Sequence, residues 1–105
     1  MELNCTNEEK ILITVNPITS TGKPVALDGP VVVTKQVGDG DVVIQPDGKS
    51  FYVISGEIPG DTSYLVEGDA DLGSGVETIA ENVILHVAGA KAKNFGLVAN
   101  APEPK

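Results

Sequence analysis

Short β-rich runs separated by turn clusters constrain this chain more than any other feature of its sequence. Residues 11–15 (ILITV) alternate between two faces, and residues 31–37 (VVVTKQV) form a β-branched run of strand length. The clusters DGP at 28–30 and GDGD at 38–41 stop these runs with residues that turns require. Helix is expected for no more than a single turn, at residues 6–9. The pattern predicts an all-β chain of seven or eight short strands, with turns about every 8 to 12 residues.

A hairpin is the clearest local prediction. In DVVIQPDGKSFYVIS, two β-rich arms flank Pro46, Asp47 and Gly48. Proline presets a turn-compatible φ and glycine accepts a positive φ, so the two arms are expected to pair. Further strands are expected at residues 62–67, 77–87 and 95–99 (FGLVA), with a loop at 68–75.

The number and spacing of these strands are typical of an antiparallel β-sandwich, in which two sheets share one core. A chain of 105 residues has the length of one domain, here divided into an N-terminal arm (1–9), the sandwich, and a C-terminal strand and tail (90–105). Alternation leaves the inward face of residues 31–33 undecided. It predicts the core residues Ile11, Ile13, Val15, Val42, Ile44, Val53, Tyr64, Val66, Val83, Leu85 and Val87.

The charge balance excludes several classes of partner. Fifteen acidic residues against seven basic ones give a net charge of −8, and no lysine or arginine cluster is present. Binding to nucleic acid or to an anionic membrane surface is therefore not expected. The N-terminus lacks the basic and apolar regions of a signal peptide, and no apolar run is long enough to span a membrane, so the chain is expected to stay soluble after synthesis in the cytoplasm.

No catalytic or cofactor-binding constellation is visible, and the chain is not expected to be an enzyme. Cys5 is the only cysteine, and nothing in the sequence pairs it with a base or with metal ligands, so an inert thiol is predicted. His86, the only histidine, alternates with Leu85 and Val87 and is expected at the surface or in an interface. The GDGD and GSG segments lack the lysine and the following helix of a phosphate loop.

The stretch DADLGSGVE offers the one metal candidate. Asp69, Asp71 and Glu77 supply the oxygen ligands that calcium prefers, but the stretch fails the EF-hand pattern at three positions. A calcium site between strands, with Asp39 or Asp41 from another turn as a further ligand, stays open. The other interpretation is a polar loop shaped by glycine, with no metal.

The order of motifs resembles small immunoglobulin-like domains encoded in tailed-phage genomes. The resemblance covers about residues 11–103. It depends on VALDGP (25–30), GDGDVVIQPDGKSFYVIS (38–55) and, most specifically, DADLGSGVETI (69–79) with the tail AGAKAKNFGLVANAPEPK (88–105). Family members carry a tryptophan in the third strand, where this chain has Val33, Thr34 and Lys35.

The resemblance implies a structural virion component with an immunoglobulin-like sandwich. It implies an auxiliary capsid or decoration protein that binds the major capsid protein or other virion proteins, with a homo-oligomer left open. The alternative is a tail- or fibre-associated adhesion module that recognises a host glycan or Ca²⁺. We expect contacts to involve both termini, with Leu3, Phe95, Leu97 and Val98 as the interface residues.

Overall fold

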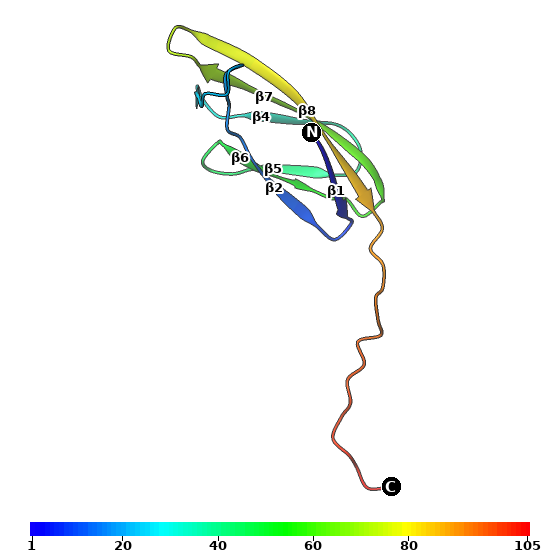
Figure 1. Cartoon of the computed structure of the whole chain (residues 1–105). Coiled ribbons are helices and arrows are strands. Elements are labelled where there is room, and N and C mark those ends of the chain that lie inside the picture. Colours follow the sequence, from blue (N-terminus) through cyan, green and yellow to red (C-terminus); the bar gives the residue numbers. More distant parts are fainter.

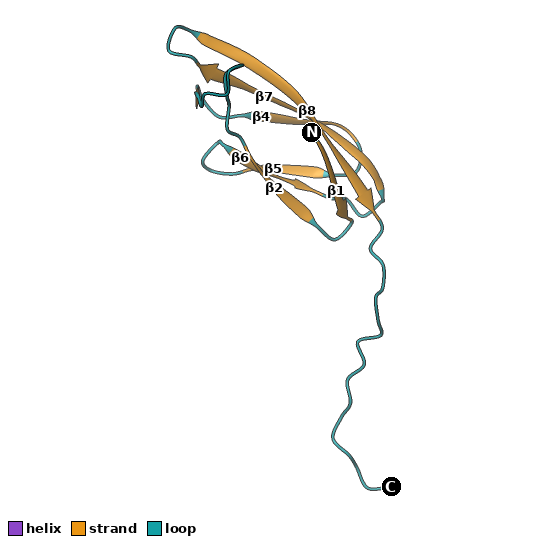
Figure 2. Cartoon of the chain, in the orientation of Figure 1, coloured by secondary structure: helices purple, strands orange, loops and turns teal.

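The computed structural model describes residues 1–105 and is all-β, as predicted (Figures 1 and 2). Residues 6–9 form a turn rather than helix, in which the Glu9 amide donates to the Thr6 carbonyl at 3.2 Å. The eight strands are β1 (Glu2–Thr6), β2 (Lys10–Thr14), β3 (Ala26–Leu27), β4 (Val32–Val37), β5 (Asp41–Ile44), β6 (Ser50–Ile54), β7 (Gly60–Asp71) and β8 (Val76–Ala88).

The strands form two sheets. The larger sheet has the order β1-β8-β7, and β7 also pairs with β4 and, further along, with β3. The smaller sheet has the order β2-β6-β5 and is antiparallel. The larger sheet is mixed, because β1 and β8 run parallel, which corrects the expectation of purely antiparallel pairing. Parallel neighbours need a long connection, and here almost the whole domain lies between them.

The N-terminal segment is a strand of the sheet rather than an arm. Glu2 to Thr6 pair with residues 84–88 of β8, and Leu3 and Cys5 pack against the core. Alternation of half-buried and exposed residues along β1 explains this placement, because one face of the segment is apolar enough to cover the core. The prediction of an N-terminal arm was therefore wrong.

Both sheets contribute to the core, since β6 supplies buried side chains from one sheet and β7 and β8 supply them from the other. All predicted core residues except Ile44 are buried or pack against this cluster; Ile44, at the end of the edge strand β5, is 41% exposed. Phe51 was missed although it is fully buried, since β6 is the central strand of its sheet. The cluster consists of Val31, Phe51, Val53, Tyr64, Val83, Leu85 and Val87.

Two hydrogen bonds tie the start of β5 to β7 across the sheets. The Tyr64 hydroxyl donates to the Asp41 carbonyl at 2.8 Å, and the Gly40 amide donates to Thr62 Oγ1 at 3.1 Å in a buried position. Burial, with the negative charge of Asp41 as a smaller cause, raises the pKa of Tyr64 to about 12. The hydroxyl therefore keeps its proton and acts as a donor at neutral pH.

The predicted hairpin is confirmed as β5–β6. Gly48 adopts a positive φ of 67° in its turn, and Asp47 Oδ1 accepts from the Lys49 amide at 2.9 Å and the Ser50 amide at 3.2 Å. These bonds satisfy backbone donors that the turn would otherwise leave unpaired, so the aspartate fixes the turn.

The β7–β8 hairpin is longer than its sequence suggested. Residues 68–71 belong to β7, and only residues 72–75 form the turn, which is closed by a bond from the Leu72 amide to the Gly75 carbonyl at 2.9 Å. The prediction of a loop over residues 68–75 was therefore wrong for its first half. Pairing with β8 over the full length of β7 satisfies the backbone of these polar residues.

Residues 89–105 leave the body as an extended tail, visible in Figure 1 as the orange to red segment. The expected strand at residues 95–99 does not form, because no neighbouring strand pairs with it. Phe95 is 95% exposed, and the molecule measures 82 × 28 × 25 Å. A β-rich sequence alone does not make a strand without a partner to receive its backbone hydrogen bonds.

Candidate functional site

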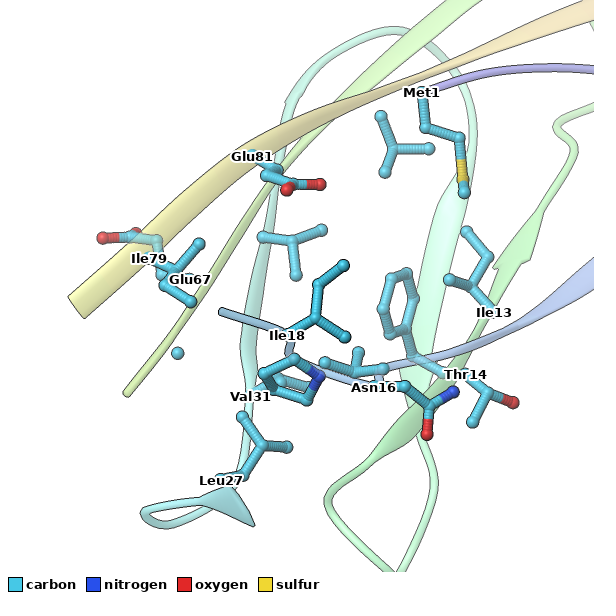
Figure 3. Close-up of a pocket in the computed structure, with 16 residues that line it drawn as sticks. Met1, Ile13, Thr14, Asn16, Ile18, Leu27, Val31, Glu67, Ile79 and Glu81 are labelled. Atoms are coloured by element: carbon cyan, nitrogen blue, oxygen red, sulfur yellow. The ribbon is translucent and has the colours of Figure 1, made fainter. Parts of the chain in front are cut away.

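An apolar groove opens between the two sheets at the end where β7 and β8 extend past β2. Its volume is about 310 Å³. Figure 3 shows Ile79 and Glu81 on the β8 side, with Ile13 and Ile18 among the residues across from them. Phe51 also lines the groove. An apolar lining with a few carboxylates at its margin suits an apolar side chain carried by a polar or basic segment.

Beside the groove, β8 has an open edge. Strand β1 pairs only with residues 84–88, and the N-terminal ammonium of Met1 donates to the Asn82 carbonyl at 3.0 Å. Residues 76–82 therefore pair with β7 on one side and have no strand on the other. Such an edge presents unpaired backbone donors and acceptors to any extended segment.

The open part of β8 also carries charged side chains on its inner face. Because alternate residues share a face, Glu77, Ile79 and Glu81 point to the same side as the buried Val83 and Leu85. The glutamates are exposed, since β2 ends before it would cover them. Inward-facing charges are a known protection of sheet edges against aggregation, so the two glutamates disfavour non-specific strand pairing at this edge.

Charge is distributed unevenly between body and tail. The β7–β8 hairpin, residues 60–88, contains six carboxylates and no lysine or arginine. The tail, residues 89–105, contains three lysines and one glutamate. In a chain of net charge −8, the tail is thus a basic segment attached to an acidic body, and the two are electrostatically complementary.

The structure does not bring the calcium candidates together. Asp69 Oδ1 accepts from Thr78 Oγ1 at 2.7 Å and Asp71 Oδ1 accepts from the Gly73 amide at 2.9 Å, whereas Glu77 lies on the opposite face of the hairpin, paired with Ala70. No group of three or more His, Cys, Asp or Glu side chains is arranged to hold a metal ion.

The second turn proposed for that site lies elsewhere. Asp39 Oδ2 accepts from the Ile58 amide at 3.2 Å, and Asp41 Oδ1 accepts from the Val42 amide at 2.8 Å. This turn adjoins Thr62, and the hairpin tip is about 30 Å further along β7 at about 3.3 Å per residue. Each of these aspartates accepts a hydrogen bond from a backbone amide or a hydroxyl group of the chain.

His86 is at the surface, as predicted, and it links three strands. Its Nδ1 is 2.7 Å from Asp61 Oδ1 on β7, and its Nε2 is 3.0 Å from Glu2 Oε1 on β1. The hydrogen bond to Asp61, followed by that to Glu2, raises the pKa of the imidazole. A protonated ring donates through both nitrogens, so in its charged form His86 connects β8 to both β1 and β7 by hydrogen bonds.

Cys5 is half-buried and forms no disulfide. Burial is the main cause that raises the pKa of its thiol, with the negative charge of Glu9 adding to it. A thiol with a raised pKa is a poor nucleophile, because the thiolate is the reactive form. This position against the core supports the prediction of an inert thiol.

The four predicted interface residues separate into two groups. Phe95, Leu97 and Val98 project from the tail and are 95%, 89% and 84% exposed. Leu3 is half-buried, packs against the core, and is not part of that surface. The open edge of β8 was missed, although the glutamates at inward positions 77 and 81 interrupt the apolar alternation and were a readable signal that nothing covers this part of the strand.

Comparisons with protein-family models, with curated proteins and with solved structures gave no match for this chain. No helix in the structure has the length and apolar character needed to cross a membrane. The functional assignment therefore rests on the groove, the open strand edge and the tail.

Proposed function

We propose that this chain is a structural virion protein, an auxiliary capsid or decoration protein of a tailed phage, which is attached through its C-terminal tail. The observation that carries the proposal is the tail itself. It holds three large apolar side chains, Phe95, Leu97 and Val98, almost fully in solvent. Apolar residues gathered in this way on an extended segment are typical of a docking element rather than of an ordinary protein surface.

The strand order supports an immunoglobulin-like sandwich as the finer fold assignment. In such domains, strands B, E and D form one sheet and strands C, F and G the other. Strands β2, β6 and β5 correspond to the first set, and β4, β7 and β8 to the second. The buried cluster contributed by both sheets is what a sandwich requires.

The charge distribution supports a display role. The acidic body suits a surface that faces solvent and repels its neighbours, whereas the basic, apolar tail suits a protein contact. The tail is also long enough to reach a separate subunit, since 17 extended residues span about 55 Å.

The test is quantitative mass spectrometry of purified phage particles, with the copy number of this chain compared with that of the major capsid protein. We expect a simple fraction of the shell subunits for the unaltered chain. For the double variant Phe95→Ser with Leu97→Ser, the copy number should fall at least tenfold. Ile58→Ser is the matched control, because Ile58 is 68% exposed on the body, and it should leave the copy number unchanged.

Other outcomes would revise or overturn the proposal. A few copies per particle would move the chain to the tail or a fibre. Absence of the unaltered chain from particles would refute a virion role. Equal incorporation of the tail variant and the control would refute attachment through Phe95 and Leu97.

A further inference from the structure

We propose that the partner of the tail is a second copy of this chain. The tail of one copy adds as a strand to the open edge of β8, residues 76–82, in the other copy, and inserts Phe95 and Leu97 into the apolar groove. This inference deepens the proposed function and rests on its premise that the tail is the attachment element. It names a second copy as the receptor of the tail, so that the unit incorporated into the particle is an oligomer whose assembly requires Phe95 and Leu97.

The lengths and faces of the two segments agree. The open edge spans seven residues of β8, of which only Asn82 already has its carbonyl bonded on this side, to the Met1 ammonium, and residues 91–99 of the tail can lie alongside the other six. In an extended strand, Phe95 and Leu97 share one face and Val98 points to the other. A strand added at the edge of β8 would direct one face of its side chains toward the groove, next to Ile79.

Opposite charges of the tail and of β8 meet whether the tail runs parallel or antiparallel to β8. With Phe95 placed beside Ile79, Lys93 lies beside Glu81 in an antiparallel arrangement and beside Glu77 in a parallel one. The two glutamates are the exposed carboxylates on the inner face of this edge. Opposite charges at neighbouring positions would both fix the register and favour the tail over the acidic segments of the body.

The tail of the same chain does not fit this edge. From Ala88, where the tail starts, to Glu81 is about 23 Å along β8, and residues 89–95 span about the same distance when fully extended. No length is left for the chain reversal. The path is also blocked, because β1 already occupies the edge of β8 at residues 84–88. A second copy approaches without either constraint, and two copies can exchange tails reciprocally in a closed dimer.

Light scattering coupled to size-exclusion chromatography tests the inference on the full chain, over a hundredfold range of concentration. We expect the mass to rise from 10.8 kDa toward twice that value. Phe95→Ser with Leu97→Ser should stay at 10.8 kDa at all concentrations, and so should Ile79→Arg, which fills the groove. Val98→Ser is the matched control, because it removes an equally exposed tail residue from the opposite face, and it should still associate.

Mixing the two monomeric variants identifies the contact. The double tail variant keeps an intact groove, and Ile79→Arg keeps an intact tail, so their equimolar mixture should form a complex that neither forms alone. A monomeric unaltered chain, association that survives the double tail substitution, Val98→Ser as disruptive as the double variant, or no complex in the mixture would overturn the inference. Circular dichroism confirms that each variant is folded.

Incorporation into phage particles separates this inference from the proposed function. If the unaltered chain is monomeric but the double tail variant is still lost from particles, attachment through the tail holds and the second copy is not its receptor. If the unaltered chain associates through the groove but is absent from particles, the self-association holds and the virion role fails.

Discussion

Substitution of Gly40 by alanine tests the hydrogen-bonded tie between the sheets. A methyl group at Gly40 would lie 2.5 Å from the Tyr64 hydroxyl oxygen, 2.9 Å from the Ile54 carbonyl oxygen and 3.0 Å from Thr62 Cγ2. Favourable contacts between nonbonded atoms are about 3.5 to 4.0 Å. The Tyr64 ring cannot easily move away, because it is fully buried and its hydroxyl is bonded to Asp41. Gly40 does not have a positive φ, so the cost is one of packing and not of backbone strain.

The magnitude follows from two contributions. Inserting a methyl group into a well-packed site costs about 1 to 3 kcal/mol, and loss of the Tyr64 hydrogen bond costs about 1 kcal/mol more. We expect Gly40→Ala to lower the free energy of unfolding by about 2 to 4 kcal/mol. Domains of this kind are stable by about 5 to 15 kcal/mol, so the loss is a large fraction of the total.

Urea unfolding followed by circular dichroism measures this loss, and we expect a lower midpoint with an unchanged slope. Gly75→Ala is the matched control: its new methyl group meets no atom within 4 Å and its φ is not positive, so its effect should stay within about 0.5 kcal/mol. The double variant Gly40→Ala with Tyr64→Phe should lose less unfolding free energy than the sum of the two single variants. The reason is that Tyr64→Phe removes the hydroxyl oxygen that lies closest to the new methyl group. Gly40→Ala as harmless as Gly75→Ala would refute the reasoning.

Three further predictions concern the hydrogen bonds of His86, the β5–β6 turn and the tail. Because the pKa of folded His86 is raised, its stabilising effect is present below the ordinary pKa of about 6.5 and is lost as pH rises through the raised value. Thermal scans should therefore show the unaltered chain losing more stability than His86→Gln between about pH 6 and pH 8.5. Equal losses would contradict a stabilising role for the hydrogen bonds of charged His86. Hydrogen bonds, first that from the Lys49 amide, lower the pKa of Asp47, so its contribution is present above about pH 4 and is lost as pH falls through the lowered pKa. Asp47→Ala should lower the urea midpoint at neutral pH, with a smaller difference near pH 2; a difference independent of pH would argue against the turn bonds. The double tail variant should leave the unfolding free energy of the dilute monomer within about 0.5 kcal/mol, because Phe95 and Leu97 are almost fully exposed. A larger loss in urea unfolding would show that the tail already packs on its own chain.

Much of the fold could be predicted from local patterns. The β5–β6 hairpin was predicted because its turn residues and the alternation of its arms are short-range properties. The strand at 77–87 was predicted within one residue at each end, since its apolar second half alternates regularly. Burial of Phe51 was not predicted, because it depends on β6 being the middle strand of its sheet, which the sequence does not state.

The candidate site was predictable only in part. Phe95, Leu97 and Val98 were singled out as interface residues and are exposed in the structure, but residues 95–99 were expected to form a strand, since their composition is β-rich. A strand needs a partner for its backbone, and no partner lies within the reach of the tail in its own chain. Residues 68–75 were expected to be a loop, and a calcium site with Asp69, Asp71 and Glu77 was left open, but pairing along β7 and β8 places Glu77 on the face opposite Asp69.

The sequence by itself determined the all-β character, the turns, the alternating faces and the contrast between an acidic body and a basic, apolar tail. These properties depend on each residue and its near neighbours. Only the tertiary structure decided that β1 pairs in parallel with residues 84–88 of β8, that the first half of β8 is left without a second neighbouring strand, and that a groove lies beside it. Pairing between segments some 80 residues apart depends on the packing of the whole core, and it is this packing that leaves an open edge on the body and an unpaired strand-like segment in the tail.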